Sequence, residues 1–523
     1  MRASLMKAAL TSFERYLRRF VTRRPRVTVT LLTLGLMLMV LAIIPRPLSP
    51  DVLGQLWIAD RLRGGARLYL DISEVNPPLW FWMAVPLQAM ADGIHAHPDR
   101  VLAVSIGAAA LLSLLTTDRL LRERTPAARV MFLAYAAAIL LIMPLRDLGQ
   151  REQWALITTL PYVALIARRR DGRQVPHWLA LLIGVQAAVG FALKHYFIGA
   201  PILLEIWLLL RLRRDWRPIR SETVALAACA IAYAAAIMVW TPAFLAISVP
   251  ETALAYSAAS VPEWRYMLRP AQPIWALIIA GIVMRRQATR QSLPALPALS
   301  IALLVAAAGF GIAWLLQLKG WPYHSIPVTG LLALALAALV MDMPRLGLVR
   351  PVLLAGLCAP LLLAAVPTQW RPTPEEDIAP ALADLRAGAV VGVLAREGWT
   401  TWPATADRGF RINGRHGALW ILSAIDRNAS GARDPRIYAL GRRMVRRTAR
   451  DYRCLPPERI IFYPGRASKT ATSASDNPLL FFSRDPEFAA VLSHYRRLAL
   501  PGRFDAFTLD RPLPRLPPSQ CPR

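Results

Sequence analysis

The sequence predicts an α-helical polytopic membrane protein with a small α/β domain at its C-terminal end. Its 523 residues are 55% hydrophobic with a mean hydropathy of +0.38, and long apolar runs recur along the first two thirds of the chain. Ordinary globular domains are less apolar and do not repeat runs of this length. The net charge of +29 comes largely from arginines between the apolar runs, where cytoplasmic loops concentrate them, so nucleic acid is not an expected partner.

The apolar runs predict about eleven transmembrane helices by the criterion of roughly 20 apolar residues per span. Three runs are short enough to be tilted, re-entrant or merged with a neighbour, namely 153–167, 196–210 and 271–284. A basic N-terminus, 1–26, precedes the first run, which lacks the small-residue cleavage site of a signal peptide. We therefore expect an uncleaved first helix, with a signal peptide as the alternative. The segments are 27–45, 99–117, 128–145, 153–167, 177–193, 196–210, 222–240, 271–284, 294–316, 325–341 and 351–366.

The distribution of basic residues predicts the orientation in the membrane. With the N-terminus inside, the cytoplasmic connections and the N-terminus carry more than twice as many lysines and arginines as the opposite connections. An odd number of spans then places the C-terminal region outside, in the periplasm if the membrane is the inner membrane of a Gram-negative bacterium. We expect a cytoplasmic N-terminus (1–26), a transmembrane domain (27–366) with a first outer loop (46–98), and a periplasmic α/β domain (367–523).

The C-terminal region is long enough to have its own core. Its pattern predicts strands at 389–395, 458–465 and 503–512, and helices at 374–388 and 486–498. A Ser/Thr-rich stretch, 466–478, is expected to be a surface loop, and the Pro-rich end, 511–523, to be extended. If this region faces an oxidising compartment, Cys454 and Cys521 can form a disulfide, although the sequence does not show that they meet.

Polar and charged residues gather at the predicted outer ends of the helices. Ionisable groups at that depth are costly unless they face a cavity or one another, which indicates a hydrated site at the outer face. Carboxylates suit proton abstraction, and cationic groups suit a phosphate leaving group. The alternative is that single lysines and arginines merely extend to the lipid headgroups. The candidates are Asp51, Asp71, Glu74 and Asn76 in the first outer loop, and Arg151, Glu152, Lys194, His195, Tyr196, Lys319, Tyr323 and His324 in later turns.

The first outer loop resembles that of a known superfamily. The stretch "PDVLGQLWIADRLRGGARLYLDISEVNPPLWFW" is similar to the loop of GT-C fold membrane glycosyltransferases, especially the protein-mannosyltransferase and aminoarabinose-transferase-like group (glycosyltransferase family 39-like). In this resemblance Asp51 takes the place of the acid after the first helix and Tyr69 and Asp71 that of the following turn, and Pro77 and Pro78 are expected to start a helix that lies along the membrane. The chain departs from the pattern at Val52, which replaces a second acid, and at Gln55, which stands where a tyrosine often falls.

The resemblance implies transfer of a sugar from a polyprenyl-phosphate donor to an envelope acceptor, which is a lipid, a glycan or a protein. It implies an inverting reaction in which Asp51 is the general base, while Arg151, Lys194, Lys319 and His324 stabilise the departing lipid phosphate. Asp71, Glu74 and Asn76 are candidates for binding sugar hydroxyls, although Asp71 could only stabilise its turn. Membrane lipids are further expected partners. No cofactor is expected with certainty, and a divalent cation is left open.

Two other classes of protein stay open at this stage. A flippase or transporter for lipid-linked sugars would place ionisable or helix-breaking residues near the membrane centre, in paired halves. The apolar segments here are nearly free of charge, with Glu205 the main exception. A non-catalytic envelope assembly protein is the other alternative, because the missing second acid is what a decayed site would show.

Overall fold

The structure is a computed structural model of the chain. It describes residues 20–44, 48–259, 264–290, 297–317, 319–343, 378–396, 408–431, 433–464 and 477–522, together with 354, 356, 398 and 400–402. The contacts between residues divide the chain into two compact units. Unit 1 comprises Met1–Pro45, His95–Ala234 and Pro262–Gln369, and unit 2 comprises Arg46–Ile94, Ala235–Val261 and Trp370–Arg523.

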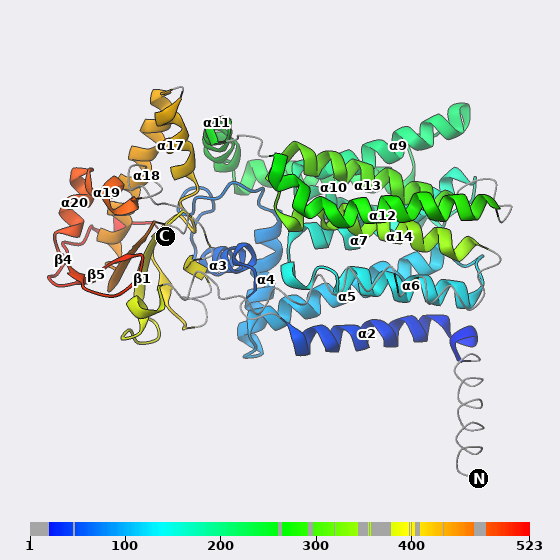
Figure 1. The fold of residues 1–523 in the computed structure, drawn as a ribbon, viewed down its shortest axis with the longest axis horizontal. Coiled ribbons are helices and arrows are strands. Elements are labelled where there is room, and N and C mark those ends of the chain that lie inside the picture. Colours follow the sequence, from blue (N-terminus) through cyan, green and yellow to red (C-terminus); the bar gives the residue numbers. More distant parts are fainter. Residues whose placement is uncertain are drawn as a thin grey trace, which may run out of the picture. The chain divides into compact units, whose positions relative to one another are not determined.

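Unit 1 is a bundle of helices (Figure 1). Ten of the predicted apolar segments coincide with helices, and the last, 351–366, lies almost entirely outside the described residues. The helices are α2 (Pro25–Ile43), α5 (Pro98–Leu120), α6 (Pro126–Leu141), α7 (Arg151–Arg170), α8 (His177–Ala192), α9 (Gly199–Leu212), α10 (Ser221–Trp240, which ends in unit 2), α12 (Trp264–Arg290), α13 (Ala298–Gln317) and α14 (Ile326–Asp342).

Six helical segments within the described residues are long and apolar enough to cross a membrane. They are Pro25–Ile43, Pro98–Leu120, His195–Asp215, Ser221–Trp240, Ala298–Gln317 and Pro322–Asp342, and two shorter apolar helices are Pro126–Leu141 and His177–Ala192. The segments expected to be insecure all lie in helices, namely α7, η2 (His195–Ile198) with α9, and α12. The count of eleven spans stays a prediction.

The helices α7 and α14 form the buried centre of unit 1. Both are buried along most of their length, and each packs against α13. Small residues let helix backbones approach closely, as they do in membrane bundles. A Cβ atom placed on Gly309 of α13 would lie only 2.5 Å from the Cα of Ala200 in α9, so this crossing depends on glycine.

Ion pairs join the helix ends at the predicted cytoplasmic end of unit 1. Asp118 of α5 is fully buried and accepts hydrogen bonds from Arg26 (3.2 Å to Nε) and Arg129 (2.9 Å to Nε). Glu222 of α10 is bonded by Arg169 (2.9 Å between Nη2 and Oε2) and by Arg220 (2.8 Å between Nε and Oε1). These carboxylates are therefore paired, as buried charges in a membrane protein must be.

Unit 2 contains a mixed five-stranded sheet with the order β2-β1-β3-β5-β4. The strand β1 (Val390–Ala395) is parallel to β2 (Arg411–Ile412) and β3 (Arg459–Tyr463), with Val393 opposite Ile461. The strand β5 (Asp505–Leu509) is antiparallel to β3 and to β4 (Tyr495–Leu498). Both β1 and β3 are buried throughout, which explains why they appear in the sequence as continuous apolar runs.

The two faces of the sheet belong to two hydrophobic cores. Leu394, Ile460, Phe462 and Phe507 face the helices α17 (Ile421–Ser430), α18 (Pro435–Cys454), α19 (Pro478–Ser483) and α20 (Pro486–Leu492). Their neighbours along the strands, among them Val393, Ile461 and Ala506, face a smaller core with the 3₁₀ turn η9 (Ala379–Leu382). This alternation is what the pleat of a strand dictates.

The structure confirms the three predicted strands and corrects two predicted helices. The helix expected at 486–498 ends at Leu492, and Tyr495–Leu498 is instead the edge strand β4, whose Tyr495 hydroxyl donates to the carbonyl of Pro457 (2.9 Å). Over its described part, the helix expected at 374–388 is only the turn η9. The helices α17 and α18 were not predicted from the sequence. Cys454 and Cys521 are joined in a disulfide.

The first outer loop and the C-terminal region belong to the same compact unit. The loop contains α3 (Pro50–Arg63) and α4 (Leu79–Gly93), and α4 begins directly after Pro77 and Pro78, as expected. A middle segment adds the π-helix η4 (Phe244–Ser248) and α11 (Val249–Ala259), whose Ala255 packs into the core beneath α17 and α18. The predicted domain limits, 27–366 and 367–523, stay a prediction. They follow chain order and therefore group the first outer loop with the transmembrane segments, whereas the contacts group it with the C-terminal region.

Candidate functional site

Five side chains form a buried polar cluster in unit 1. Arg151 and Glu152 begin α7, Lys194 follows α8, Gln317 ends α13, and His324 lies in the 3₁₀ turn η5 (Pro322–Ser325) before α14. The Nζ atom of Lys194 donates to Glu152 Oε1 (2.5 Å) and to Gln317 Oε1 (3.3 Å), and His324 Nε2 lies 3.8 Å from Glu152 Oε1. The alternating helix directions bring these chain positions to one end of the bundle, as the topology predicted.

The polar cluster is not saturated with hydrogen bonds. Within the described part of the chain, Glu152 Oε2, Arg151 Nε and Nη1, and His324 Nδ1 are buried and have no hydrogen-bond partner. Such groups each cost about 1–3 kcal/mol, and native proteins contain few of them. Arg151 and Lys194 carry two positive charges against the single negative charge of Glu152. The cluster can therefore accept an additional anionic group.

The other residues predicted for this end lie around the polar cluster. The ring of Tyr323 lies 5.7 Å from Lys194 Nζ, a cation–π contact. Lys319 is exposed and close enough for its charge to act on Lys194. His195 is exposed, and its ring packs on that of Tyr196 at 3.9 Å between centroids. Gln317 was not among the predicted residues, although it stands two residues before Lys319.

In unit 2, Asp51 lies in the first turn of α3 and is exposed. Several other residues of this helix are buried, among them Val52 and Leu56, and Trp402 of the C-terminal region packs against Gly54 and Trp57. A Cβ atom on Gly54 would lie 2.9 Å from Trp402 Nε1, and the rings of Trp57 and Trp402 lie 5.0 Å apart. This contact joins α3 to the C-terminal region within unit 2.

Asp71 is buried and bound within its own turn. Its carboxylate accepts hydrogen bonds from the backbone N–H of Arg67 (2.9 Å) and from the Arg67 guanidinium (2.9 and 3.1 Å). Burial opposes ionisation of Asp71, but these bonds outweigh it and lower the pKa of Asp71 below its ordinary value. Tyr69 in the same turn has a positive φ of 67°, and its hydroxyl donates to the carbonyl of Asn76 (2.6 Å). The geometry therefore gives Asp71 a role in the turn, and sugar binding by it stays a prediction.

Glu74 and Asn76 are also held by local contacts. Glu74 Oε1 accepts from the backbone N–H of Asn76 (2.8 Å) and from Asn76 Nδ2 (2.5 Å), and the carbonyl of Glu74 accepts from the Ser248 hydroxyl (2.5 Å). Both residues are half-buried. Glu74 also lines a small cavity with Glu251, Arg415 and Arg447.

Arg415 joins the first outer loop to the C-terminal region. Its guanidinium binds the Asp451 carboxylate (3.0 Å from Nε to Oδ2) and donates to the carbonyl of Leu70, while its own carbonyl accepts from the Ser73 N–H (2.9 Å). Burial raises the pKa of Asp451 above its ordinary value, although Arg415 favours the ionised form. The sequence carried no signal for this contact, because one arginine in a basic tail is not distinctive.

Among the described residues, no group of three or more histidine, cysteine, aspartate or glutamate side chains could hold a metal ion. The divalent cation left open by the sequence therefore has no candidate ligand set in that part of the chain.

Comparisons with known proteins bear on the fold. ArnT from Cupriavidus metallidurans, solved with bound undecaprenyl phosphate, superposes with a TM-score of 0.54 over 94% of this chain and 99% of its own, at 11% sequence identity. The chain has the GT-C fold. Together with the apolar helices of unit 1, this fold makes it a multi-pass membrane protein and confirms the predicted fold class.

Two further solved structures are similar at lower scores. The arabinofuranosyltransferase AftD from Mycobacteria has a TM-score of 0.46 at 14% identity over 94% of this chain and 42% of its own. An oligosaccharyltransferase from Archaeoglobus fulgidus has a TM-score of 0.44 at 12% identity over 93% and 74%. No protein-family model matches the chain, and no curated protein sequence matches it.

Proposed function

We propose that the protein transfers a sugar from a polyprenyl-phosphate-linked donor to an envelope acceptor at the outer face of the inner membrane. The observation that carries the proposal is the GT-C fold, shared with an ArnT that binds undecaprenyl phosphate, over nearly the whole chain. The polar cluster supports it, because its excess positive charge and unsatisfied donors suit the phosphate of such a lipid.

The proposed reaction is a single inverting displacement. Asp51 acts as the general base, since a carboxylate is ordinarily ionised at neutral pH and can take the proton of an acceptor hydroxyl. The acceptor oxygen attacks the anomeric carbon as the bond to the lipid phosphate breaks. Arg151, Lys194 and Lys319 stabilise the negative charge that develops on the phosphate, as preorganised cations do.

The remaining candidates have supporting roles in the proposal. His324 and Tyr323 line the phosphate side, and Glu152 holds Lys194 in place. Glu74 and Asn76 bind sugar hydroxyls, with Asp71 fixing their turn. The packed rings of His195 and Tyr196 contact the donor.

The proposed side of the membrane is supported by the disulfide between Cys454 and Cys521. Disulfides persist in oxidising compartments such as the periplasm and are rare in the cytoplasm. A periplasmic C-terminal region and a cytoplasmic N-terminus agree with the distribution of basic residues.

The test is sugar transfer by the purified protein in lipid, with polyprenyl-phosphate sugars as donors and extracted envelope as acceptor. We expect turnover by the wild type and a loss of about 100-fold or more in Asp51→Asn. Asp60→Asn is the matched control, because Asp60 is exposed on the same helix and should leave turnover unchanged. Equal turnover by the wild type and by Asp51→Asn would show that a residue other than Asp51 is the general base. No turnover with any donor, together with lipid movement, would favour a flippase.

A further inference from the structure

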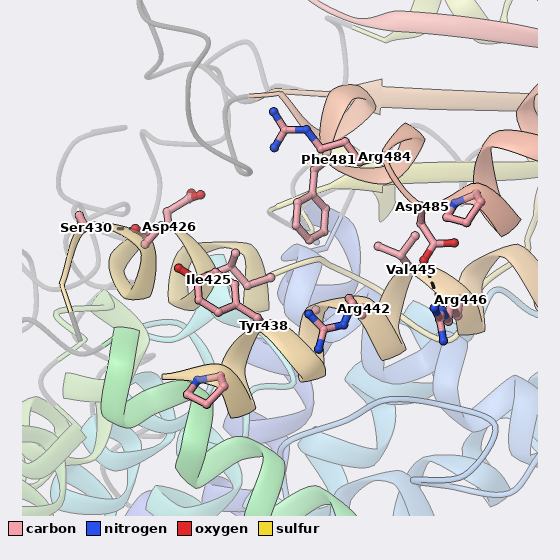
Figure 2. A pocket seen from close by; sticks show the side chains of 14 residues that line it. Ile425, Asp426, Ser430, Tyr438, Arg442, Val445, Arg446, Phe481, Arg484 and Asp485 are labelled. Atoms are coloured by element: carbon pink, nitrogen blue, oxygen red, sulfur yellow. Dashed lines mark hydrogen bonds and ion pairs between the residues drawn. The ribbon is translucent and has the colours of Figure 1, made fainter. Parts of the chain in front are cut away.

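A groove in the C-terminal region lies between α17, α18 and the corner where α19 meets α20 (Figure 2). Its volume is about 830 Å³, within the range of roughly 300–1,000 Å³ that is usual for small-molecule sites. We call it the α18 groove. It lies wholly in unit 2 and includes none of the residues assigned to sugar transfer.

The floor of the α18 groove is apolar. Ile425 and Val445 are buried side chains that line it, and Phe481 projects over it from α19. A Cβ atom on Gly441 would lie 2.8 Å from Ile425 Cδ1 and 3.4 Å from Phe481 Cζ. Glycine at this position therefore keeps the floor open, and the floor suits a hydrocarbon group that leaves water.

The α18 side of the groove is cationic. Tyr438, Arg442 and Arg446 are spaced four residues apart, so they lie on one face of α18. Asp485 binds Arg446 (3.3 Å from Nε to Oδ2). In the part of the chain that the structure describes, Arg442 and Arg484 are in no ion pair. A guanidinium fork without a carboxylate partner is well suited to phosphate.

We propose that the α18 groove binds an amphiphile with a phosphate headgroup. The phosphate accepts hydrogen bonds from Arg442, and the hydrocarbon lies over Ile425, Gly441 and Phe481. Asp426 lines the α17 side of the groove, where its negative charge repels the phosphate, so the headgroup belongs on α18. This binding does not require sugar transfer, and its failure would leave the proposed reaction intact.

The experiment uses the full chain in nanodiscs of an uncharged glycolipid that carries no phosphate, titrated with dodecyl phosphate. Hydrogen exchange of residues 435–446 reports binding at the groove. We expect saturable protection of this segment and a dissociation constant raised about tenfold or more in Arg442→Gln, because hydrogen bonds to charged groups are worth that much. Arg450→Gln is the matched control, since Arg450 is exposed on α18 and does not line the groove.

Two further probes test the contributions of the phosphate and of the hydrocarbon one at a time. Inorganic phosphate alone should give little protection at the same concentration, and the neutral amphiphile dodecyl maltoside should give none. Equal protection by inorganic phosphate would overturn the requirement for a hydrocarbon, and equal protection by dodecyl maltoside would overturn recognition of phosphate. Unchanged binding by Arg442→Gln would overturn the assignment to this groove.

Discussion

The ion pair between Lys194 and Glu152 is the residue-scale feature that most constrains the polar cluster. The carboxylate is fully buried and the ammonium nearly so, and removing one partner of such a pair leaves an uncompensated charge. We expect Lys194→Met and Glu152→Gln each to destabilise the protein by about 3 kcal/mol or more. The double variant should lose less than the sum of the two single losses, because it removes both charges.

Thermal unfolding in detergent measures these differences. Arg146→Gln is a suitable control, since Arg146 is exposed in the turn before α7 and its loss should shift the midpoint little. Strictly additive losses in the double variant would show that the two side chains act independently and would contradict the pair seen in the structure.

Asp71 provides a pH-dependent prediction at the same scale. Because its pKa is lowered in the folded protein, its contribution to stability is fully present above the ordinary value of about 4 and is lost as the pH falls through the lowered value. We expect Asp71→Asn to unfold at a lower temperature than the wild type at pH 7, by an amount equivalent to about 1–2 kcal/mol. The gap should narrow below pH 4, and a gap that widens there would contradict the assignment.

Residue-scale prediction from the sequence succeeded where chain topology was sufficient. Alternating helix directions place Arg151, Lys194 and His324 at one end of the bundle, whatever the details of packing. The contacts of Gln317 and Arg415 could not be predicted in this way. They depend on which side chains meet across elements far apart in the chain, and neither residue type is unusual at its position.

At the scale of elements, Arg415 connects the first outer loop with the edge of the C-terminal sheet region. It contacts the carbonyl of Leu70 and the carboxylate of Asp451 and also accepts from the Ser73 N–H. We expect Arg415→Ala to increase hydrogen exchange across residues 66–76, because the bond from the side chain to the Leu70 carbonyl is lost and only the backbone bond to Ser73 remains. Arg411→Ala, at an exposed position on β2, is the control. Exchange in the loop that is unchanged by Arg415→Ala would show that other contacts hold it.

The strands that are buried on both faces were the ones that the sequence predicted best. The strands β1 and β3 are buried throughout and stand out as apolar runs, whereas β4 has a mixed pattern, with Arg496 and Arg497 exposed. The residues of β4 follow α20 closely and fit a continued helix equally well. Only the pairing of β4 with β5 identifies it as a strand. The helix α18 was not predicted because many arginines stand between the apolar residues of its buried face. These apolar residues are Ile437, Leu440, Met444 and Val445.

At the scale of the whole molecule, the disulfide closes a long stretch of the C-terminal region. Cys454 and Cys521 are 67 residues apart in the sequence, and a loop of that length corresponds to about 4 kcal/mol in the chain-entropy account of cross-links. We expect reduction to lower the unfolding temperature of this region. The variant Cys454→Ser should behave alike with and without reductant, and an equal response of the wild type and the variant would mean that the bridge contributes no stability.

The orientation in the membrane is the remaining whole-molecule prediction, and it can be tested directly. Arg450 in the C-terminal region and Arg214 after α9 are both exposed, and the predicted topology places them on opposite sides of the membrane. In a background with Cys229 and Cys358 replaced by alanine, we expect Arg450→Cys to react with an impermeant maleimide in spheroplasts. Arg214→Cys should react only after the membrane is opened, because the positive-inside rule keeps the arginine-rich connection 211–217 in the cytoplasm. The reverse labelling would invert the topology, and it would place Asp51 on the cytoplasmic side, where a donor presented at the outer face could not reach it.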